Sequence, residues 1–346
     1  MTDSEQPFVS IILPIRNEED FIERTLRSIL ENDYAPERVE IMVVDGMSDD
    51  RTRQIVTEMA QECSHLKLLD NPLRVAPCAL NIGLRAMRGE LFTIIGGHAE
   101  IAPDFIRRSV ETLLSNPEAW IVGGSIETIA TGYSGNAIAA AMRSPIGVGD
   151  SLFRLGNYEG WVDTLAFGTH HRWILDKIGY FDEELIRNQD DDFNMRVHLG
   201  GGKIWLSQSI KSKYYSRSSL RKLWRQYFQY GFWRIRTMQK HRRPATLRQA
   251  VPLLFAGSLL VLAAAGFFWR PFWWLLGAEL VLYAVGIAYG SIDVAGKAGL
   301  KYLPPAPIVF LILHFGYGLG SLWGLVRFVL LRGWKMKRAE EFNLSR

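Results

Sequence analysis

The chain of 346 residues is 48% hydrophobic and 22% charged, with a formal charge of +4, and this composition excludes disordered, collagen-like and coiled-coil proteins. Its two cysteines, Cys63 and Cys78, exclude a disulfide scaffold and a zinc site of clustered thiols. Residues 1–192 carry 17 Lys/Arg and 32 Asp/Glu, a net of −15, whereas residues 193–346 carry 23 and 4, a net of +19. Such an asymmetry predicts a basic half that meets nucleic acid or a membrane.

Short apolar runs alternate with segments of helical spacing near the N-terminus. Strands are predicted at 8–14, 39–44, 66–69 and 91–95, and helices at 18–30, 49–62 and 76–87, with Ser48 or Asp49 as cap of the second helix. This alternation predicts a parallel sheet with crossover helices, in which ligands bind beyond the carboxyl ends of the strands. Residues 14–18, 45–50 and 96–100 should therefore converge on one crevice. The sequence has no GxGxxG and no GxxxxGK[ST], which disfavours dinucleotide-binding and P-loop proteins.

Two charged residues follow these predicted strands. Asp45 ends the second strand, where its carboxylate could accept hydrogen bonds from a base or a ribose, and Arg74 lies in a loop where it could meet a phosphate. The alternative for Arg74 is a side chain exposed to solvent without a ligand. For Asp49 and Asp50, which follow the same strand, the alternative to ligand binding is capping of the next helix.

An acidic run, Asp190 to Asp192, is the sharper feature. Three consecutive carboxylates repel one another unless something offsets their charge. Either they form a solvated helix N-terminus, where acids favour the dipole, or one of them is a general base that takes the proton of an attacking hydroxyl.

The segment from Lys203 to Arg248 holds 13 Lys/Arg and no acid, interleaved with aromatic residues. A nucleic-acid reader has this composition, but the position before a hydrophobic run favours an amphipathic helix on an anionic cytoplasmic leaflet. The positive-inside rule then places residues 1–248 in the cytoplasm.

Three hydrophobic runs follow, at 251–269, 272–290 and 304–326. The first would be about 28 Å long as a helix, close to the hydrocarbon thickness of a bilayer. Trp269, Trp273 and Trp274 suit an interfacial belt, so a transmembrane region is predicted.

The C-terminal end of this region raises a question of topology. Three full crossings would place the basic residues after Leu331 outside, against the positive-inside rule. Either one run is re-entrant or interfacial, or the rule fails for this tail. No signal peptide is expected, because Met1–Gln6 is polar and the apolar run after it is short.

Taken together, these features resemble the inverting family 2 glycosyltransferases, especially the membrane-bound enzymes of the succinoglycan type. The matching stretches are Val9–Glu18, Val43–Thr52, Asn81–Glu90, Gly96–Asp104, Asn188–Arg196, Gly201–Trp205 and Tyr227–Trp233. The resemblance covers roughly residues 8–240 and extends to the hydrophobic tail.

The resemblance implies a GT-A catalytic domain, an α/β Rossmann-like fold with a mostly parallel sheet, followed by an α-helical transmembrane region. It divides the chain into a glycosyltransferase domain (1–202), a basic aromatic interfacial helical segment (203–248) and a transmembrane region with a basic tail (249–346). It also implies a multi-pass protein of the cell (inner) membrane whose catalytic domain faces the cytoplasm.

The implied reaction is hexosyl transfer, with inversion, from a nucleotide-diphosphate sugar to a hydroxyl of a polyprenyl-linked saccharide acceptor, in exopolysaccharide or glycolipid biosynthesis. Nucleic acid is not an expected partner. By this resemblance Asp190 is the catalytic base, with Asp191 beside it. The donor-binding residues are Pro14, Asn17, Glu18, Asp45, Arg74 and Gly97. On the acceptor side, His170 and His171 follow a turn, Phe167–Thr169, that resembles the family's acceptor-side loop, and the alternative is a pair of ordinary surface residues. Trp161 could stack on a sugar face or fill the core.

The sequence departs from the family pattern at two positions. Gly96 replaces the Asp that would bind a divalent cation, Mg²⁺ or Mn²⁺, which leaves His98 and Glu100 as candidate ligands. Gln189 replaces the usual Glu before the base. Stabilisation of the diphosphate would then fall to Arg74 or other cations. The alternative is a non-catalytic subunit of a polysaccharide assembly complex that binds nucleotide or saccharide at the membrane.

Overall fold

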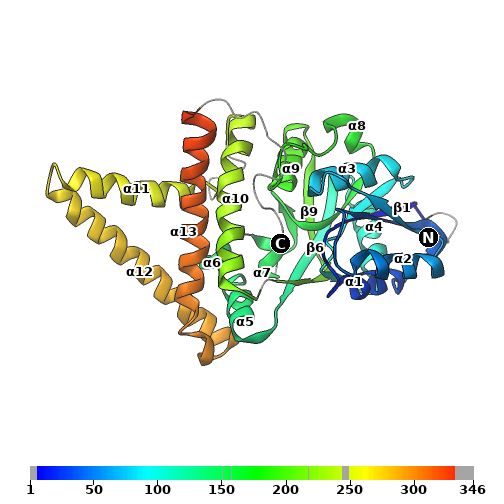
Figure 1. Ribbon diagram of the computed structural model, residues 1–346, viewed down its shortest axis with the longest axis horizontal. Coiled ribbons are helices and arrows are strands. Elements are labelled where there is room, and N and C mark those ends of the chain that lie inside the picture. Colours follow the sequence, from blue (N-terminus) through cyan, green and yellow to red (C-terminus); the bar gives the residue numbers. More distant parts are fainter. Residues whose placement is uncertain (1–5, 150, 157, 217, 244–248, 332–346) are drawn as a thin grey trace. The chain divides into compact units, whose positions relative to one another are not determined.

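The computed structural model describes residues 6–331 except 150, 157, 217 and 244–248 (Figure 1). Its contacts divide the chain into two units. Among the described residues, unit 1 contains 6–127 and 156–214, and unit 2 contains 128–155 and 215–331. The boundaries at 202 and 248 that the sequence suggested remain a prediction, and the basic C-terminal tail lies outside the described residues.

A nine-stranded mixed sheet forms the centre of unit 1. Its strands are β1 (Val9–Ile15), β2 (Val39–Asp45), β3 (Leu66–Asp70), β4 (Leu91–Ile94), β5 (Ala99–Ile101), β6 (Ala119–Ile129), β7 (Gly160–Val162), β8 (Ala166–His171) and β9 (Lys203–Tyr215). They lie in the order β3-β2-β1-β4-β8-β6-β9-β5, with β7 beside β9. The four N-terminal strands are parallel, as predicted.

The prediction of a mostly parallel sheet is wrong for the other strands. Strand β8 runs antiparallel to β4 and β6, and β5 and β7 run antiparallel to β9. A parallel connection needs a crossover of about a dozen residues or more. Only four residues, 95–98, separate β4 from β5, so the pattern of crossover helices ends there.

Helices cover both faces of this sheet. They are α1 (Ile22–Leu30), α2 (Thr52–Glu62), α3 (Ala76–Ala86), α4 (Phe105–Ser115), α8 (Ile174–Ile178) and α9 (Gln189–Leu199). On one face, alternate side chains of β1 pack with α1, α2 and α4 in a single core. On the other face α3 lies so close that a Cβ on Gly83 would be 2.7 Å from Cγ2 of Ile12. Burial on both faces explains why β1 and β2 are almost entirely apolar.

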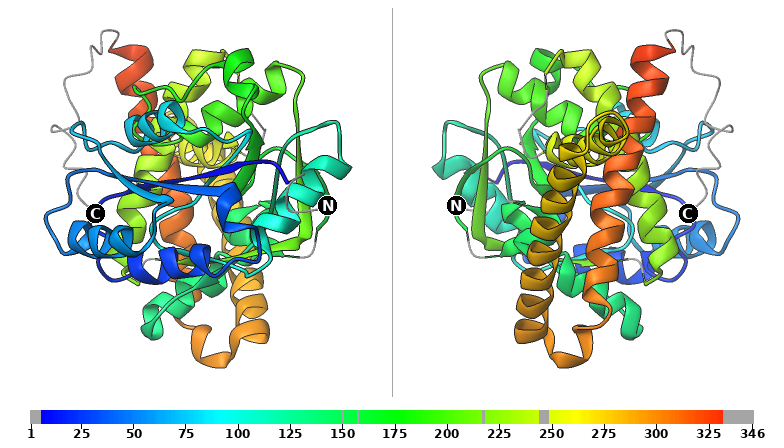
Figure 2. Two further views of the ribbon diagram at one scale, coloured as in Figure 1. Left: turned by 90° about the vertical axis from the view of Figure 1, so that its right-hand side faces the viewer. Right: turned by 90° about the vertical axis from the view of Figure 1, so that its left-hand side faces the viewer.

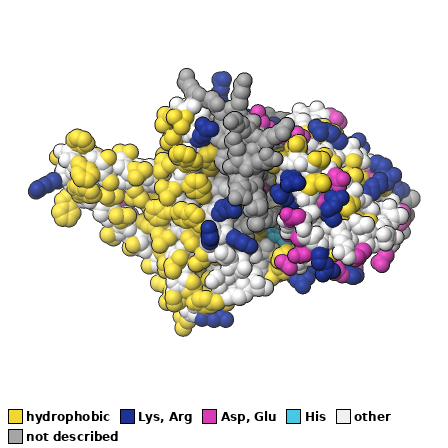
Figure 3. Space-filling view, in the orientation of Figure 1, with side chains coloured by type: hydrophobic (Ala, Val, Ile, Leu, Met, Phe, Trp, Pro, Cys, Tyr) yellow, Lys and Arg dark blue, Asp and Glu magenta, His cyan; other side chains and the backbone are white. Residues whose placement is uncertain are grey.

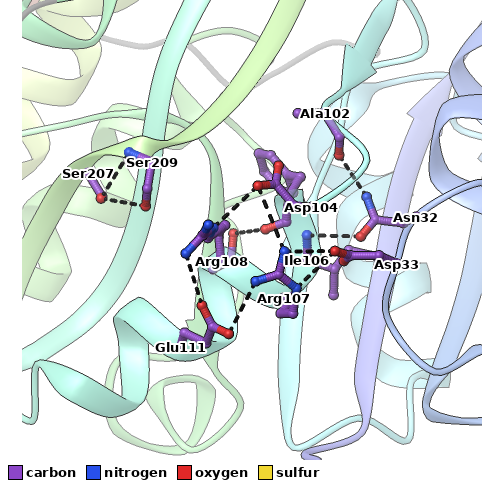
Figure 4. A network of polar contacts seen from close by, with 12 residues as sticks. Asn32, Asp33, Ala102, Asp104, Ile106, Arg107, Arg108, Glu111, Ser207 and Ser209 are labelled. Carbon is purple, nitrogen blue, oxygen red and sulfur yellow. Dashed lines mark hydrogen bonds and ion pairs between the residues drawn. The ribbon is translucent and has the colours of Figure 1, made fainter.

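A polar network fixes the start of α4 (Figure 4). The Arg107 guanidinium lies 2.8 Å from the Asp33 carboxylate and 3.3 Å from that of Glu111. Asn32 donates to the Ala102 carbonyl at 2.8 Å and accepts from the Ile106 N–H at 3.2 Å. These contacts join the chain after α1 to the chain after β5, which holds the Gly96–Asp104 stretch in place.

The basic segment is not one interfacial helix, because residues 203–215 form strand β9. The reason is an alternation of buried and exposed residues at the two ends of the strand: Ile204, Leu206, Ile210 and Ser212 are buried, whereas Lys203, Lys211 and Lys213 are exposed. The alternation is interrupted at Ser207–Ser209, where Ser207 is buried and Gln208 is exposed. The dense positive charge concealed this alternation. The helix starts later, as α10 (Leu220–His241) in unit 2.

Unit 2 is helical. Besides α10 it contains α5 (Gly132–Ala141), α6 (Pro145–Val148), α7 (Leu152–Leu155), α11 (Val251–Gly266), α12 (Pro271–Ala298) and α13 (Ala306–Leu325). Helix α12 and the helical segment Ala306–Leu330 both have a mean hydropathy of 1.7 and are long enough to cross a membrane, whereas α11 is shorter. Two such helices are weak evidence of a membrane protein, since core helices of soluble proteins pass the same test.

Candidate active site

A cavity of about 80 Å³ lies at the carboxyl ends of β1, β2 and β3. Its lining comes from Pro14, Ile15, Arg16, Asn17, Gly46, Asn71, Arg74, Val75, Ala76, Ala79, Ile186 and Arg187. The strand ends converge as predicted, but of the three predicted clusters only residues 14–17 and Gly46 line the cavity, and residues 96–100 do not. The Asn17 N–H donates to Oγ of Ser48 at 2.8 Å, which joins the first two clusters. His98 Nδ1 lies 3.1 Å from Oε1 of Glu18, which joins the third.

The pocket is cationic although unit 1 is rich in acids. Three guanidinium side chains, Arg16, Arg74 and Arg187, contribute to its lining, and no Asp or Glu does so among the described residues. Guanidinium groups present several N–H donors in a rigid fork that matches phosphate oxygens. Of these three, the sequence analysis had singled out Arg74.

Two buried polar atoms of the lining find no hydrogen-bond partner within the described part of the chain. They are the Nε–H of Arg16, a donor, and Oδ1 of Asn71, an acceptor. Asn71 is 1% exposed, and its Nδ2 donates to the Val75 carbonyl at 2.9 Å, which fixes the orientation of the amide. Unpaired buried polar groups are costly, so both atoms are suited to a ligand.

Left-handed backbone conformations surround the pocket. Four residues with positive φ lie in or next to the lining segments: Asn17 (φ 54°), Met47 (φ 55°), Arg74 (φ 59°) and Asn188 (φ 60°). For Met and Arg this conformation is sterically unfavourable, and such strain is concentrated at binding and active sites. The turn geometry thus places Arg74 in the wall at some cost to the fold.

Asp45, predicted to contact the nucleoside, is fully buried. Its carboxylate accepts from the N–H of Ser48 at 3.0 Å and from the Ser48 hydroxyl, and Arg53 Nη1 lies 2.7 Å away. Arg53 also lies 2.8 Å from the Asp70 carboxylate, which ties the ends of β2 and β3 together. In this conformation Asp45 shapes the turn after β2 and does not line the pocket.

Glu18 and Gly97 lie behind the pocket wall. The Glu18 N–H donates to Oγ1 of Thr52 at 2.7 Å, and its side chain is 4% exposed. A Cβ on Gly97 would lie 2.8 Å from Cγ2 of Ile15 and 2.9 Å from Cγ of Glu18. Glycine therefore permits the chain after β4 to approach the end of β1.

The residues near β5 do not fit a resident divalent cation. Glu100 lies 3.4 Å from Nε of Arg24 and 3.7 Å from Nζ of Lys213, so cations already offset its charge. His98 lies against the carboxylate of Glu18. The described residues hold no group of three or more His, Cys, Asp or Glu placed to bind a metal, and Mg²⁺ or Mn²⁺ prefers a set of oxygen ligands.

The acidic run begins α9, and its members differ in environment. Asp192 is fully buried, with Oδ2 3.0 Å from Nε of Arg196. Asp190 is exposed, and its Oδ1 accepts the Asp191 N–H at 3.0 Å. The segment that leads to Asp190 supplies Ile186 and Arg187 to the pocket wall. Asp190 therefore presents an exposed carboxylate close in sequence to the pocket, whereas Asp192 is structural.

The predicted acceptor residues lie in different surroundings. His170 belongs to β8, so the expectation of a loop at this position is wrong. Its ring stacks on Phe92 at 4.5 Å, and burial lowers its pKa to about 4. A side chain enclosed in the core is not placed to contact an acceptor. Trp161 in β7 is 41% exposed, with Nζ of Lys203 5.0 Å from its ring centre.

Arg16, Asn71 and Arg187 are polar residues of the pocket to which the sequence analysis gave no individual role. Arg16 and Asn71 each follow a strand of the parallel set directly, and this position had placed residues 14–18, Arg16 among them, at the expected crevice. No comparable signal marked Arg187, because its place depends on how the chain before α9 returns to the sheet.

Comparison with known protein families identifies one match. The profile described as "Glycosyl transferase family 2" matches residues 10–146. A dolichyl N-acetyl-alpha-D-glucosaminyl phosphate 3-beta-D-2,3-diacetamido-2,3-dideoxy-beta-D-glucuronosyltransferase of Methanococcus voltae is 31% identical over 232 residues, 65% of this chain and 72% of that protein. The succinoglycan biosynthesis protein ExoA of Rhizobium meliloti is 28% identical over 317 residues, 90% of this chain and 92% of that protein.

Solved structures share the fold at lower identity. The mannosyltransferase PcManGT from Pyrobaculum calidifontis, in complex with GDP-Man and Mn²⁺, has a TM-score of 0.58 at 20% identity and covers 93% of this chain and 88% of its own. The S. aureus TarS fragment 1–349 has a TM-score of 0.51 at 16% identity, covering 91% of this chain and 90% of its own. Both are similar to the present chain in fold.

Proposed function

Because the chain belongs to glycosyl transferase family 2, we propose that this glycosyltransferase moves a sugar from a nucleotide-diphosphate donor, held in the pocket described above, to a hydroxyl of a polyprenyl-linked saccharide. The observation that carries the proposal is the pocket lined by three arginines at the ends of the parallel strands. A diphosphate brings two or more negative charges, which this set of guanidinium groups is suited to bind.

Arginine side chains take the place of a metal-binding carboxylate in this proposal. Position 96 is Gly, and Glu100 is paired with Arg24 and Lys213. Stabilisation of the departing diphosphate is therefore assigned to Arg16, Arg74 and Arg187. We route no step of the reaction through a resident cation, although PcManGT was solved with Mn²⁺.

The unpartnered atoms of the pocket suggest how the base is selected. Oδ1 of Asn71 is an acceptor held in place by the bond from Nδ2 to Val75. Uracil and guanine carry a ring N–H that can donate to it, whereas cytosine and adenine present an acceptor nitrogen at the equivalent edge. A UDP- or GDP-linked donor is therefore favoured over a CDP- or ADP-linked one.

Asp190 is assigned as the general base. Its carboxylate takes the proton from the acceptor hydroxyl as the acceptor oxygen bonds to the anomeric carbon of the donor. The bond from that carbon to the diphosphate oxygen breaks, and the nucleoside diphosphate leaves with the electron pair. Attack opposite the leaving group inverts the anomeric centre.

We assign the acceptor from the names of two similar proteins and from the exposed apolar side chains of helices α11 to α13. The name of the Methanococcus relative specifies a dolichyl-linked substrate, and the Rhizobium relative is named for succinoglycan biosynthesis. Helices α11 to α13 expose many large apolar side chains, which suits an enzyme held to the cytoplasmic face of the cell membrane near a lipid-linked acceptor.

Calorimetry of nucleotide binding tests the donor site. Replacing Arg74 with Gln should weaken UDP or GDP binding about 10- to 100-fold, because a hydrogen bond to a charged group contributes about 1.5–3 kcal/mol. Arg85→Gln is the matched control, since Arg85 is on α3 outside the pocket and its side chain is 60% exposed. Binding should persist in a chelator. Equal losses in the two variants, or tighter binding of CDP and ADP than of UDP and GDP, would contradict the assignment.

A further inference from the structure

Helices α10 and α13 of unit 2 lie side by side with their backbones in contact (Figures 1 and 2). A Cβ on Gly231 would be 1.9 Å from the Tyr317 carbonyl oxygen, and one on Gly320 would be 2.1 Å from that of Phe228. The Arg234 Nε–H donates to Oη of Tyr317 at 3.0 Å. Small residues at both helices allow this close approach, so α10 and α13 move as one body.

Helix α10 is too charged to enter a bilayer. It carries no Asp or Glu and six basic residues, Arg221, Lys222, Arg225, Arg234, Arg236 and Lys240. A Lys or Arg at the centre of a membrane helix costs about 3 kcal/mol. Since α13 is packed against α10, α13 cannot cross the hydrocarbon without bringing these charges with it, although its own length and hydropathy would permit crossing.

The two sides of α13 suit a helix that lies in the plane of the membrane surface. Gly316, Gly320 and Gly324 face α10 on one side, and Gly318 faces the first turns of α11. The other side exposes large apolar residues at helical spacing, namely Ile308, Leu311, Leu319 and Trp323. An in-plane helix immerses such an apolar side in the boundary between headgroups and acyl chains. The exposed basic side chains of α10, Arg221, Lys222, Arg225 and Lys240, supply the complementary charge for an anionic leaflet.

Helices α11 and α12 are arranged differently. They form a hairpin that leads away from α13 in Figure 1, and α11 is seen end-on in Figure 2 while α13 stands upright. Hydrophobic side chains cover the hairpin in Figure 3. The 16 residues of α11 rise about 24 Å, so the helix and the turn after it approach the hydrocarbon thickness of about 30 Å. The 28 residues of α12 are longer and can cross at a tilt.

The chemistry of the hairpin fits a crossing. Its tip contains Phe268, 92% exposed, followed by Trp269 and Arg270, a combination suited to the far interface. Within the hairpin, Oγ of Ser258 donates to the Glu279 carboxylate at 2.6 Å. The acidic group in the first third of α12 is thus hydrogen-bonded inside the hairpin and not left facing lipid.

We propose that, within the described residues, the α11–α12 hairpin alone crosses the bilayer, entering and leaving through the cytoplasmic face, while α10 and α13 lie in the interface. This proposal rests on the membrane association in the proposed function. The chain then makes two crossings in place of three. The basic C-terminal tail returns to the cytoplasm and obeys the positive-inside rule, which removes the conflict that the hydrophobic runs raised.

Cysteine accessibility in the full-length chain tests this topology. In a Cys63→Ala background, Arg270→Cys, Leu300→Cys and Ser345→Cys report the hairpin tip, the turn before α13 and the tail. Cys78 should not interfere, because burial raises the pKa of its thiol to about 12. A membrane-impermeant maleimide should label Arg270→Cys in intact cells or spheroplasts, and should label the other two after permeabilisation only.

Labelling of Ser345→Cys in intact cells would mean that α13 crosses, and would overturn the proposal. Labelling of Arg270→Cys after permeabilisation only would show that the hairpin does not cross, and labelling of Leu300→Cys from outside would reverse its orientation; either result also overturns it. UDP binding by each variant, measured as for the wild type, reports folding and tests the donor site separately. A wrong topology would leave that binding intact.

Discussion

Asp190 and Asp192 are two residues apart in the first turn of α9, yet their surroundings give them different properties. The buried carboxylate of Asp192 lies against Arg196, whose guanidinium also donates to the Tyr180 carbonyl at 2.9 Å. Removing one partner of such a buried pair leaves an uncompensated charge. Asp190 is exposed to solvent, so its substitution leaves no buried charge uncompensated and should spare the fold. This contrast makes Asp190 the informative position for catalysis.

His170 gives a prediction for the stability of the protein as a function of pH. Burial lowers its pKa from 6.5 to about 4, so the unfolded chain binds more protons than the folded one between these values. The contribution is fully present above pH 6.5 and is lost as the pH falls toward 4. Between about pH 7 and pH 5 the free energy of unfolding should fall by about 2 kcal/mol more in the wild type than in His170→Phe.

Denaturant titration of the solubilised protein at both pH values measures that difference. Phe is the replacement because the His170 ring stacks on Phe92, so packing is approximately retained. The same pH dependence in both proteins would show that His170 does not titrate with a lowered pKa.

Part of the pocket lining was predictable from the sequence. Pro14, Asn17 and Arg74 line the pocket, and their role in binding a donor stays a prediction. Asp45 lies at the predicted strand end, but Ser48 and Arg53 bind its carboxylate. The sequence does not show that the guanidinium of Arg53, eight residues further on, pairs with Asp45. The turn expected next to His170 is part of strand β8. A strand that contains Gly and polar residues is hard to distinguish from a turn by sequence alone.

Close contact between α10 and α13 gives a prediction at the scale of elements. Gly320→Ala places a methyl group where the Phe228 carbonyl oxygen lies, 2.1 Å away, and neither backbone can move without separating the helices. Such overpacking should lower the stability by about 1–3 kcal/mol. The matched control is Gly286→Ala on α12, where nothing lies within 4 Å, and where Ala should stabilise the helix by up to about 1 kcal/mol. Thermal unfolding in detergent compares the two.

If both alanine variants melted at the temperature of the wild type, the α10–α13 contact would not have the close geometry on which the topology proposal depends. That experiment therefore also bears on the two-crossing arrangement.

The helices and strands of the N-terminal part of unit 1 were predictable from the distribution of their apolar residues. The first four strands are short apolar runs, the first three helices have an apolar spacing of about 3.6, and all seven lie within a few residues of their predicted positions. Of the three capping candidates, Ser48, Asp49 and Asp50, it is Asp50 that accepts the Thr52 N–H, at 2.9 Å. The antiparallel strands and β9 were missed, since pairing partners distant in sequence decide them and charge concealed the alternation.

For the whole molecule, the division of charge proved more informative than the total. The net of −15 in residues 1–192 describes the surface of unit 1 and not its pocket, where arginines gather. The net of +19 belongs in part to strand β9 and to α10, against which the apolar α13 packs. A local count of charge at the strand ends is therefore the better guide to the ligand.

Transfer of labelled sugar tests the central claim, that catalysis occurs in this pocket through Asp190. Membranes containing the wild type are supplied with a panel of UDP- and GDP-sugars and with polyprenyl-linked lipid extract, and are compared with membranes containing Asp190→Asn. The wild type should transfer sugar to lipid, and Asp190→Asn should be slower by about 10²- to 10⁴-fold with unchanged affinity for UDP. Equal rates in the two proteins, or donor binding by the wild type without any transfer, would contradict the account.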